Sequence, residues 1–221
     1  MVTAAGNEIE QQKRAAAEAA AQLVEDGARV GLGTGTTVAY LLPALAARRL
    51  RLRCVATSPR TEVAARQLGL AVEPFTALDE LDIAIDGADQ IAPDGWLVKG
   101  GGGAHLREKI VAAAARRFVV IASADKPVER LGPPVPLELA AFGLAATLRE
   151  LGDARLREAA SSPDGGVLAD LHTSFEAPEE LVARLDATPG VLAHGLFPPA
   201  LVSDVLIGGP SGVEHRRVRL H

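Results

Sequence analysis

Four short clusters that combine glycine with polar or charged residues mark where this sequence could carry chemistry. They are "GTGTT" at 33–37, "DGAD" at 86–89, "KGGGG" at 99–103 and "SADK" at 123–126. Glycine lets the backbone approach a ligand closely, threonine hydroxyls and backbone N–H groups donate hydrogen bonds, and Asp and Lys bind charge or move protons. The chemistry to consider is anion binding beside a proton-transfer site.

The turn "GLGTGTT" at 31–37 is a candidate phosphate cradle. Such a turn exposes backbone N–H groups at a helix N-terminus, where the helix dipole favours an anion, and Thr34, Thr36 and Thr37 add hydroxyls. It lacks the Lys-Ser/Thr ending of a P-loop, and Thr36 replaces the third glycine of the dinucleotide pattern. A nucleotide is therefore disfavoured. The alternative is a tight turn whose threonines cap the helix.

Asp86 and Asp89 follow the apolar stretch "LDIAI", with Gly87 and Ala88 between them. Carboxylates in this position can bind sugar hydroxyls or move protons. Asp and Gly are also the commonest turn formers, so a purely structural interpretation stays open. A metal pair would need a third ligand, which the sequence does not suggest.

Lys99 and Glu108 flank the glycine run and form a candidate pair for proton abstraction. Glu108 lies on a helical line with Ala104 and Ala112 at i±4 spacing, so its neighbours there are small. Removing a proton beside a carbonyl needs a carboxylate base, and also a cation or donor where the oxyanion develops. The alternative is a solvated glutamate between two basic neighbours on an outer helix face.

Alternating strands and helices position these clusters. A first helix is predicted at Glu8–Glu25, followed by strands at 28–33, 52–57, 81–86, 96–99 and 118–123 and helices at 36–49, 60–69 and 104–117. Short continuous apolar strands that alternate with helices indicate a parallel, Rossmann-like sheet covered on both faces. Ligands of such α/β sheets sit outside the carboxyl ends of the strands, so the four clusters should converge on one crevice.

The pattern changes after "LGPPVP" at 131–136. The predicted elements are a strand at 136–139, a helix at 141–151, a hairpin of 154–160 and 166–172 around "SSPDGG", a helix at 178–188 and a strand at 191–197. This β-α-β-β-α-β order is typical of a small α+β ferredoxin-like domain. We expect an α/β domain at 1–131 and 203–221, which regains the apolar strand "DVLIGGPSGV", and a small domain at 132–202.

Composition narrows the function classes. The net charge of -5, without a basic stripe, argues against nucleic acid. The single Cys54 cannot form an intramolecular disulfide, and no stretch resembles a signal peptide or a membrane span. We therefore expect a cytoplasmic protein that does not bind a membrane. The five histidines lack metal-ligand spacing, which disfavours a zinc site.

"GLGTGTT", "DGAD", "KGGGGAHLREKIV" and "ADKPV", in this order and spacing, resemble the motifs of the A-type ribose-5-phosphate isomerases. The resemblance runs from the first helix to "PGVLAHGLF" and the final "IGGPSGV". It implies interconversion of ribose 5-phosphate and ribulose 5-phosphate in the pentose phosphate pathway, through an enediolate and without metal or organic cofactor. It also implies a homodimer or a higher homo-oligomer.

Carried over by position, the resemblance makes Glu108 the base that moves a proton between C1 and C2. It assigns ring opening, hydroxyl proton shuttling and oxyanion stabilisation to Asp86, Asp89 and Lys99, which are also substrate contacts. Lys13 is a weaker candidate for the phosphate. The other implied contacts with substrate or phosphate are Thr34, Gly35, Thr36, Thr37, Gly87, Ala88, Gly100, Gly101, Gly102 and Lys126.

The sequence departs from the family pattern at Gln90, where glutamate is usual, and at Ser123, where aspartate is common. The stretch 150–166 lacks the usual "GG-x-P", which affects the outer edge of the small domain. Two other functions remain: a different sugar-phosphate enzyme, such as a lactonase or amino-sugar deaminase, and a non-catalytic sugar-phosphate sensor. The Lys-glycine-Glu grouping argues against the first, and the lack of a visible DNA-binding segment argues against the second.

Overall fold

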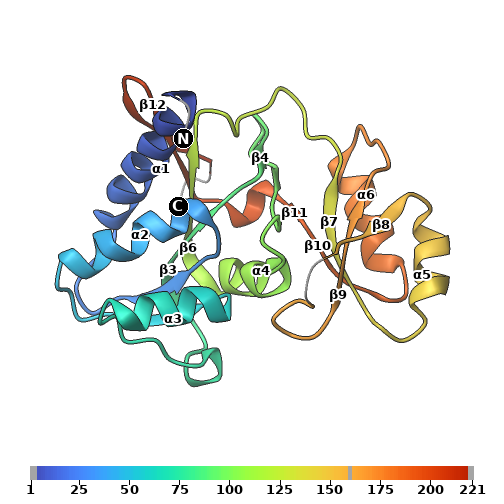
Figure 1. Cartoon of the computed structure of the whole chain (residues 1–221), viewed down its shortest axis with the longest axis horizontal. Coiled ribbons are helices and arrows are strands. Elements are labelled where there is room, and N and C mark those ends of the chain that lie inside the picture. The colour runs from blue at the N-terminus through green and yellow to red at the C-terminus, as the bar shows by residue number, and fades with distance from the viewer. Residues whose placement is uncertain (1–3, 159–160, 219–221) are drawn as a thin grey trace.

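A six-stranded sheet forms the larger part of the molecule, at the left of Figure 1. The structure, a computed structural model, describes residues 4–158 and 161–218. Five strands run parallel, and the sixth, β13, pairs antiparallel with β12 at one edge. In spatial order they are β13 (Gly212–Arg217), β12 (Asp204–Gly209), β6 (Ala115–Ser123), β3 (Leu81–Gly87), β1 (Arg29–Leu32) and β2 (Arg53–Ala56).

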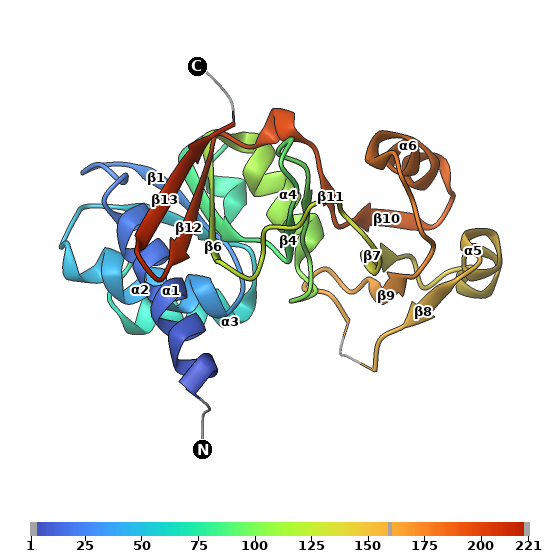
Figure 2. The same ribbon diagram turned by 90° about the horizontal axis from the view of Figure 1, so that it is seen from above.

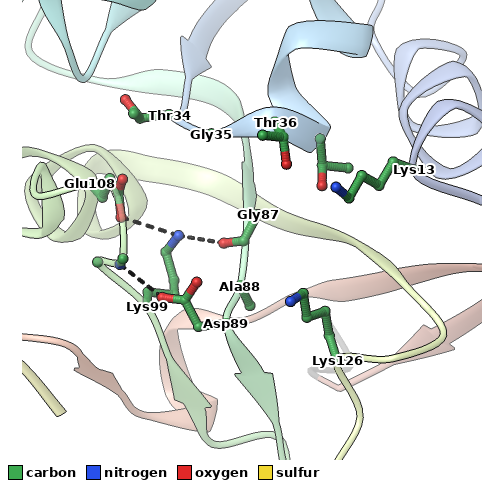
Figure 3. Close-up of a pocket in the computed structure, with 14 residues that line it drawn as sticks. Lys13, Thr34, Gly35, Thr36, Gly87, Ala88, Asp89, Lys99, Glu108 and Lys126 are labelled. Atoms are coloured by element: carbon green, nitrogen blue, oxygen red, sulfur yellow. Dashed lines mark hydrogen bonds and ion pairs between the residues drawn. The ribbon is translucent and has the colours of Figure 1, made fainter. Parts of the chain in front are cut away.

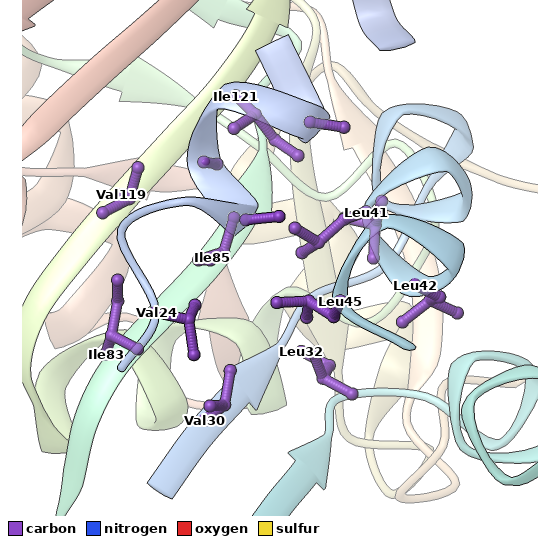
Figure 4. Close-up of a cluster of buried hydrophobic side chains, with 14 of the residues drawn as sticks. Val24, Val30, Leu32, Leu41, Leu42, Leu45, Ile83, Ile85, Val119 and Ile121 are labelled. Carbon is purple, nitrogen blue, oxygen red and sulfur yellow. The ribbon is translucent and has the colours of Figure 1, made fainter. Parts of the chain in front are cut away.

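Helices cover both faces of this sheet because its central strands are apolar on both sides. Side chains alternate between the faces, so Ile83 and Ile85 pack toward one core while Ala84 packs toward the other. The first core, drawn in Figure 4, includes α1 and α2, and the second includes α4. Burying one such isoleucine or leucine stabilises the fold by about 2 kcal/mol. The helices are α1 (Ala4–Ala21), α2 (Thr36–Ala47), α3 (Pro59–Gln67) and α4 (His105–Ala114), with a 3₁₀ turn η1 (Phe75–Ala77).

A four-stranded antiparallel sheet forms the smaller part, at the right of Figures 1 and 2. Its chain order is the predicted β-α-β-β-α-β, and its spatial order, fourth-first-third-second, makes every pairing antiparallel. In space the strands are β10 (Val191–His194), β7 (Val135–Leu139), β9 (Val167–Leu171) and β8 (Ala154–Leu156), with helices α5 (Leu144–Leu151) and α6 (Pro178–Ala187). The domain limits proposed from the sequence remain a prediction.

A short third sheet lies between the two parts and corrects one prediction. It consists of β11 (Leu196–Phe197), β5 (Leu97–Val98) and β4 (Gln90–Ile91), all antiparallel. We predicted 96–99 as a strand of the parallel sheet, which is wrong. Only a tight turn through Gly95 separates β4 from β5, and a parallel partner would require a crossover of a dozen residues or more.

Other elements also differ from the prediction, at their ends or as strands that were not predicted. The helix expected at 104–117 ends at Ala114, because 115–117 already pair with β3 as part of β6. The strand expected at 191–197 divides at Gly195, where a Cβ atom would lie 2.1 Å from the Lys99 carbonyl oxygen. β13 was not predicted, since its largely exposed residues give no apolar signal.

The first helix, predicted at 8–25, spans Ala4–Ala21, and β4 was not predicted. β12 returns to the first sheet as expected, preceded by the 3₁₀ turn η2 (Pro199–Leu201). Within the predicted strand 154–160, β8 covers 154–156, while 159–160 lie outside the described residues, as do 1–3 and 219–221 of the predicted larger domain. No helix in the described part of the chain is long and apolar enough to span a membrane.

Candidate active site

The predicted clusters converge on one pocket of about 130 Å³ at the carboxyl ends of β1 and β3 (Figure 3). It lies between the N-termini of α2 and α4. Its lining comprises Lys13, Thr34, Gly35, Thr36, Thr37, Gly87, Ala88, Asp89, Lys99, Gly100, Gly101, Gly102, Glu108 and Lys126. Every predicted site residue except Asp86 therefore lines the same pocket, and so does Lys13.

Three buried charges form the inner end of the pocket. Nζ of Lys99 lies 3.0 Å from Oδ2 of Asp86 and 3.2 Å from Oε2 of Glu108, and it also donates to the carbonyl oxygen of Gly87. None of the three charged residues is more than 3% exposed. Asp86 sits behind the pocket wall and contacts the pocket through Lys99. Glu108 is thus no solvated helix glutamate.

Burial controls the protonation of this group. It raises the pKa of Glu108, and the negative charge of Asp86 raises it further against the opposing effect of Lys99. The pKa of Asp86 is likewise raised by burial, although Lys99 and two backbone N–H groups favour its charged form. Burial alone would lower the pKa of Lys99, but the two carboxylates outweigh it and raise the pKa. Lys99 therefore stays positively charged, and the Glu108 carboxylate has an increased affinity for a proton.

Local sequence places these carboxylates. Asp86 ends β3, and its Oδ1 accepts from the backbone N–H groups of Thr34, at 3.0 Å, and Gly87, at 2.7 Å. A Cβ atom at Gly33 would lie 2.0 Å from this carboxyl, so Gly33 makes room for Asp86. Glu108 lies in the first turn of α4, where the helix dipole favours a negative charge.

The glycine run brings backbone against Asp89. Gly100 and Gly103 have φ of 98° and 75°, values that favour glycine, and the N–H of Gly103 bonds the carbonyl oxygen of Gly100 at 3.0 Å. The N–H of Gly101 donates to Oδ2 of Asp89 at 2.8 Å. The loop thereby presents N–H groups to the pocket, beside Lys99.

The outer end of the pocket has the character of an anion site. α2 begins after Gly35, whose φ is 131°, and no side chain caps its N-terminal N–H groups. Lys13 from α1 and Lys126, after β6, extend toward this end in Figure 3. Lys13 is held by Glu10 at 2.7 Å, which also accepts from the Tyr40 hydroxyl.

Sequence reasoning missed one contact with the site. Arg157, from the small sheet, donates to the carbonyl oxygens of Gly100 and Gly101. No motif indicated Arg157, because the stretch 150–166 lacks the "GG-x-P" motif that is usual in the family. Within residues 4–158 and 161–218, no three His, Cys, Asp or Glu side chains are grouped as a metal site would require.

Comparison with known proteins identifies the family. The model of "Ribose 5-phosphate isomerase A (phosphoriboisomerase A)" matches residues 53–212. The chain belongs to this family. It is 47% identical to ribose-5-phosphate isomerase A of Roseiflexus castenholzii, over 91% of this chain and 93% of that protein. The resemblance noted in the sequence is thereby confirmed.

Solved isomerase structures agree with this assignment. The ribose 5-phosphate isomerase A of Neisseria gonorrhoeae superposes with a TM-score of 0.91 at 30% identity, covering 100% of both chains. A D-ribose-5-phosphate isomerase in complex with phospho-erythronic acid gives 0.89 at 29% identity, over 95% of this chain and 99% of that one. The predicted fold class is confirmed. The chain is an isomerase of the pentose phosphate pathway that interconverts ribose 5-phosphate and ribulose 5-phosphate.

Proposed function

We propose that the chain performs this isomerisation through an enediolate, with Glu108 as the base and Lys99 as the principal cation facing the oxyanion. The observation that carries the proposal is the 3.2 Å contact between Nζ of Lys99 and Oε2 of Glu108 in a group that water barely reaches. A raised pKa suits Glu108 to a general base, because it strengthens the carboxylate's affinity for a proton. Glu108 takes the proton from C2 of the aldose and returns it to C1 of the enediolate.

The contacts of Lys99 suggest how the charge is handled. Its Nζ donates a hydrogen bond to the Gly87 carbonyl oxygen and forms ion pairs with Asp86 and Glu108, and Oε2 of Glu108 accepts no hydrogen bond within the described residues. An oxyanion can replace the partner that is held least firmly. Glu108 is that partner, since it becomes neutral and a weaker acceptor when it takes the proton. The ammonium then turns toward the oxygen where negative charge develops.

The remaining predicted residues have supporting roles in this proposal. Asp89, held at the pocket wall by the N–H of Gly101, shuttles protons between the sugar hydroxyls and assists ring opening. Asp86 keeps Lys99 charged and oriented. The phosphate binds at the N-terminus of α2 with Thr36, Thr37, Lys13 and Lys126, which places C1 and C2 toward the buried charges.

Replacing Glu108 by glutamine tests the base. Glu108→Gln keeps size and hydrogen bonding but removes the proton acceptor, so turnover should fall roughly 10²- to 10⁴-fold while sugar-phosphate binding persists. In D₂O the wild type should introduce solvent deuterium at the transferred position, and the variant should show neither exchange nor isomerisation. Glu179→Gln, in the exposed first turn of α6, is the matched control. Near-normal exchange in Glu108→Gln would move the base role to Asp86 or Asp89.

We also propose that the chain assembles as a homodimer or a higher homo-oligomer in the cytoplasm. The 95% exposed ring of Phe142 supports assembly, because an exposed aromatic ring beside an apolar groove is stabilised when covered. Sedimentation equilibrium should give a mass at least twice that of one chain. A monomer at micromolar concentration would contradict this part of the proposal.

A further inference from the structure

Arg157 connects the small sheet to the glycine loop through a fixed guanidinium group. It directly follows β8, and its Nη1 donates to the carbonyl oxygens of Gly100 at 3.0 Å and Gly101 at 3.2 Å. Its Nε and Nη2 donate to the two carboxylate oxygens of Asp170, on β9, at 2.8 and 2.6 Å. The Arg157 side chain is 16% exposed. A planar fork held by a carboxylate on one side has little freedom to turn on the other.

The two carbonyl contacts set the direction of two N–H groups. In a trans peptide group the C=O and N–H bonds point in opposite directions. The carbonyls of Gly100 and Gly101 share peptide groups with the N–H of Gly101 and Gly102. Because both oxygens turn toward Arg157, both N–H groups turn away from it, and Gly101 and Gly102 line the pocket. The 2.8 Å bond from Gly101 N–H to Asp89 agrees with this direction.

The loop is enclosed on its other sides as well. A Cβ atom at Gly100 would lie 2.7 Å from Nδ1 of the buried His105 ring, and one at Gly103 would lie 2.6 Å from the Leu168 side chain. Burial lowers the pKa of His105 to about 3, so this ring stays neutral. Arg157 is therefore the charged group that faces the loop carbonyls. Four glycines without such a partner would have many other conformations available.

We propose that Arg157 is a positioning residue for the isomerisation: by holding the carbonyls of Gly100 and Gly101 it aims the N–H of Gly102 at the enediolate oxygens and the N–H of Gly101 at Asp89, the proposed proton shuttle. The inference rests on the proposed enediolate mechanism and adds the small sheet to the catalytic apparatus. Asp170 fixes the guanidinium, and the loop transmits its position to the pocket. The phosphate end of the pocket is not involved, since the side-chain hydrogen bonds of Arg157 within the described residues go to Gly100, Gly101 and Asp170.

Kinetics of Arg157→Met test the proposal. A loop displaced by about 1 Å should lower kcat roughly 10- to 100-fold. Affinity for phospho-erythronic acid, whose carboxylate resembles the enediolate oxygens, should weaken by a similar factor, while KM and inhibition by inorganic phosphate change little. Millimolar guanidinium chloride should restore part of kcat, and equimolar sodium chloride should not. Arg155→Met is the matched control, because Arg155 lies on β8 with an exposed pairing to Asp153.

The outcomes separate positioning from a general structural role. An unchanged kcat in Arg157→Met, or equal losses for phospho-erythronic acid and inorganic phosphate without guanidinium rescue, would overturn the proposal. If Arg157→Met does not fold, Arg157→Lys keeps the charge but cannot hold both carbonyls and Asp170 in one plane, and it should show the same selective loss. Failure of the enediolate mechanism would be evident separately, as isomerisation by the wild type in D₂O that introduces no solvent deuterium at the transferred position.

Discussion

The two ends of the active-site pocket differ in solvent exposure more than in charge. At the inner end, Lys99 and its two carboxylates are almost completely buried. At the outer end, the Lys126 side chain is 34% exposed and pairs with Asp125, which is 40% exposed. The same residue types thus occur in a dry setting and in a wet one.

This difference assigns distinct tasks to the two ends. Charges act more strongly where water is excluded, and groups fixed in advance need no reorganisation when charge develops in the transition state. Exposed charges are screened by water and salt, but they can attract and retain an anion. We infer that the inner end lowers the barrier, while the outer end supplies binding. The predictions below test that division.

Lys99→Met should give the largest effect on turnover after Glu108→Gln. It should leave phosphate binding at the outer end of the pocket unchanged. Loss of the cation facing the oxyanion should raise the barrier by about 3 kcal/mol, as for other lost oxyanion donors. Removing it also leaves two buried carboxylates without a counter-charge, which should lower the free energy of unfolding by about 3–5 kcal/mol. Steady-state kinetics and urea unfolding measure the two effects.

The control for Lys99→Met is inhibition by inorganic phosphate, which should stay close to the wild-type value. A parallel loss of phosphate inhibition would show that the two ends do not act separately. A kcat within twofold of the wild type, in a folded variant, would remove Lys99 from the proposed mechanism.

Lys126→Met should give a smaller effect, and this effect should be on substrate binding rather than on turnover. A charge-assisted hydrogen bond to phosphate is worth about 1.5–3 kcal/mol. Because the Lys126 side chain is partly exposed, we expect its contribution to be near the lower limit of this range. We expect KM to rise about tenfold with little change in kcat. The KM of the wild type should also rise with salt, more than that of Lys126→Met. A fall in kcat at constant KM would contradict the binding role.

The pH dependence of activity and of stability should have opposite signs. In the proposed mechanism activity needs ionised Glu108, so kcat/KM should rise with pH through the raised pKa of this residue. Stability behaves inversely. Between pH 4.5, the ordinary pKa of a glutamate, and the raised pKa of Glu108, the folded state binds a proton that the unfolded state has released. Unfolding free energy should therefore decline with pH in this window in the wild type, and decline less in Glu108→Gln. Equal slopes in both proteins would show that Glu108 titrates normally.

Chelation should have the smallest effect. In the proposed mechanism the Lys99 ammonium supplies the positive charge that polarises the substrate, so dialysis against EDTA should leave turnover unchanged. Activity that is lost on chelation and restored by one divalent metal would mean that Asp86 and Asp89 act as metal ligands.

Much of the site could be predicted because its motifs are local in the chain. In a parallel sheet, residues just after the strands meet at one edge whatever the rest of the fold does. The turn 33–37 and the pair Asp86 and Asp89 were found in this way, and the helical spacing placed Glu108 beside small neighbours. The order of elements in the small sheet followed from its hairpin and helix signals in the same manner.

Other features depended on contacts between distant segments, which no local pattern encodes. β5 is too short for its pairing to be predicted from two apolar residues, and its partner β11 lies about a hundred residues away in the chain. Asp86 faces Lys99 from behind the pocket wall because Gly33 leaves the space, a relation that only packing reveals.

The residue types and spacing in the sequence determined that a glutamate, a lysine and a glycine-threonine turn would share one crevice. The tertiary structure decided which of these groups are dry and which are wet, because burial depends on everything packed around a side chain. It also decided that Arg157 reaches Gly100 and Gly101 from the other sheet. Electrostatic strength and backbone direction arise from that assembly, since both require atoms far apart in the chain to be held at fixed distances.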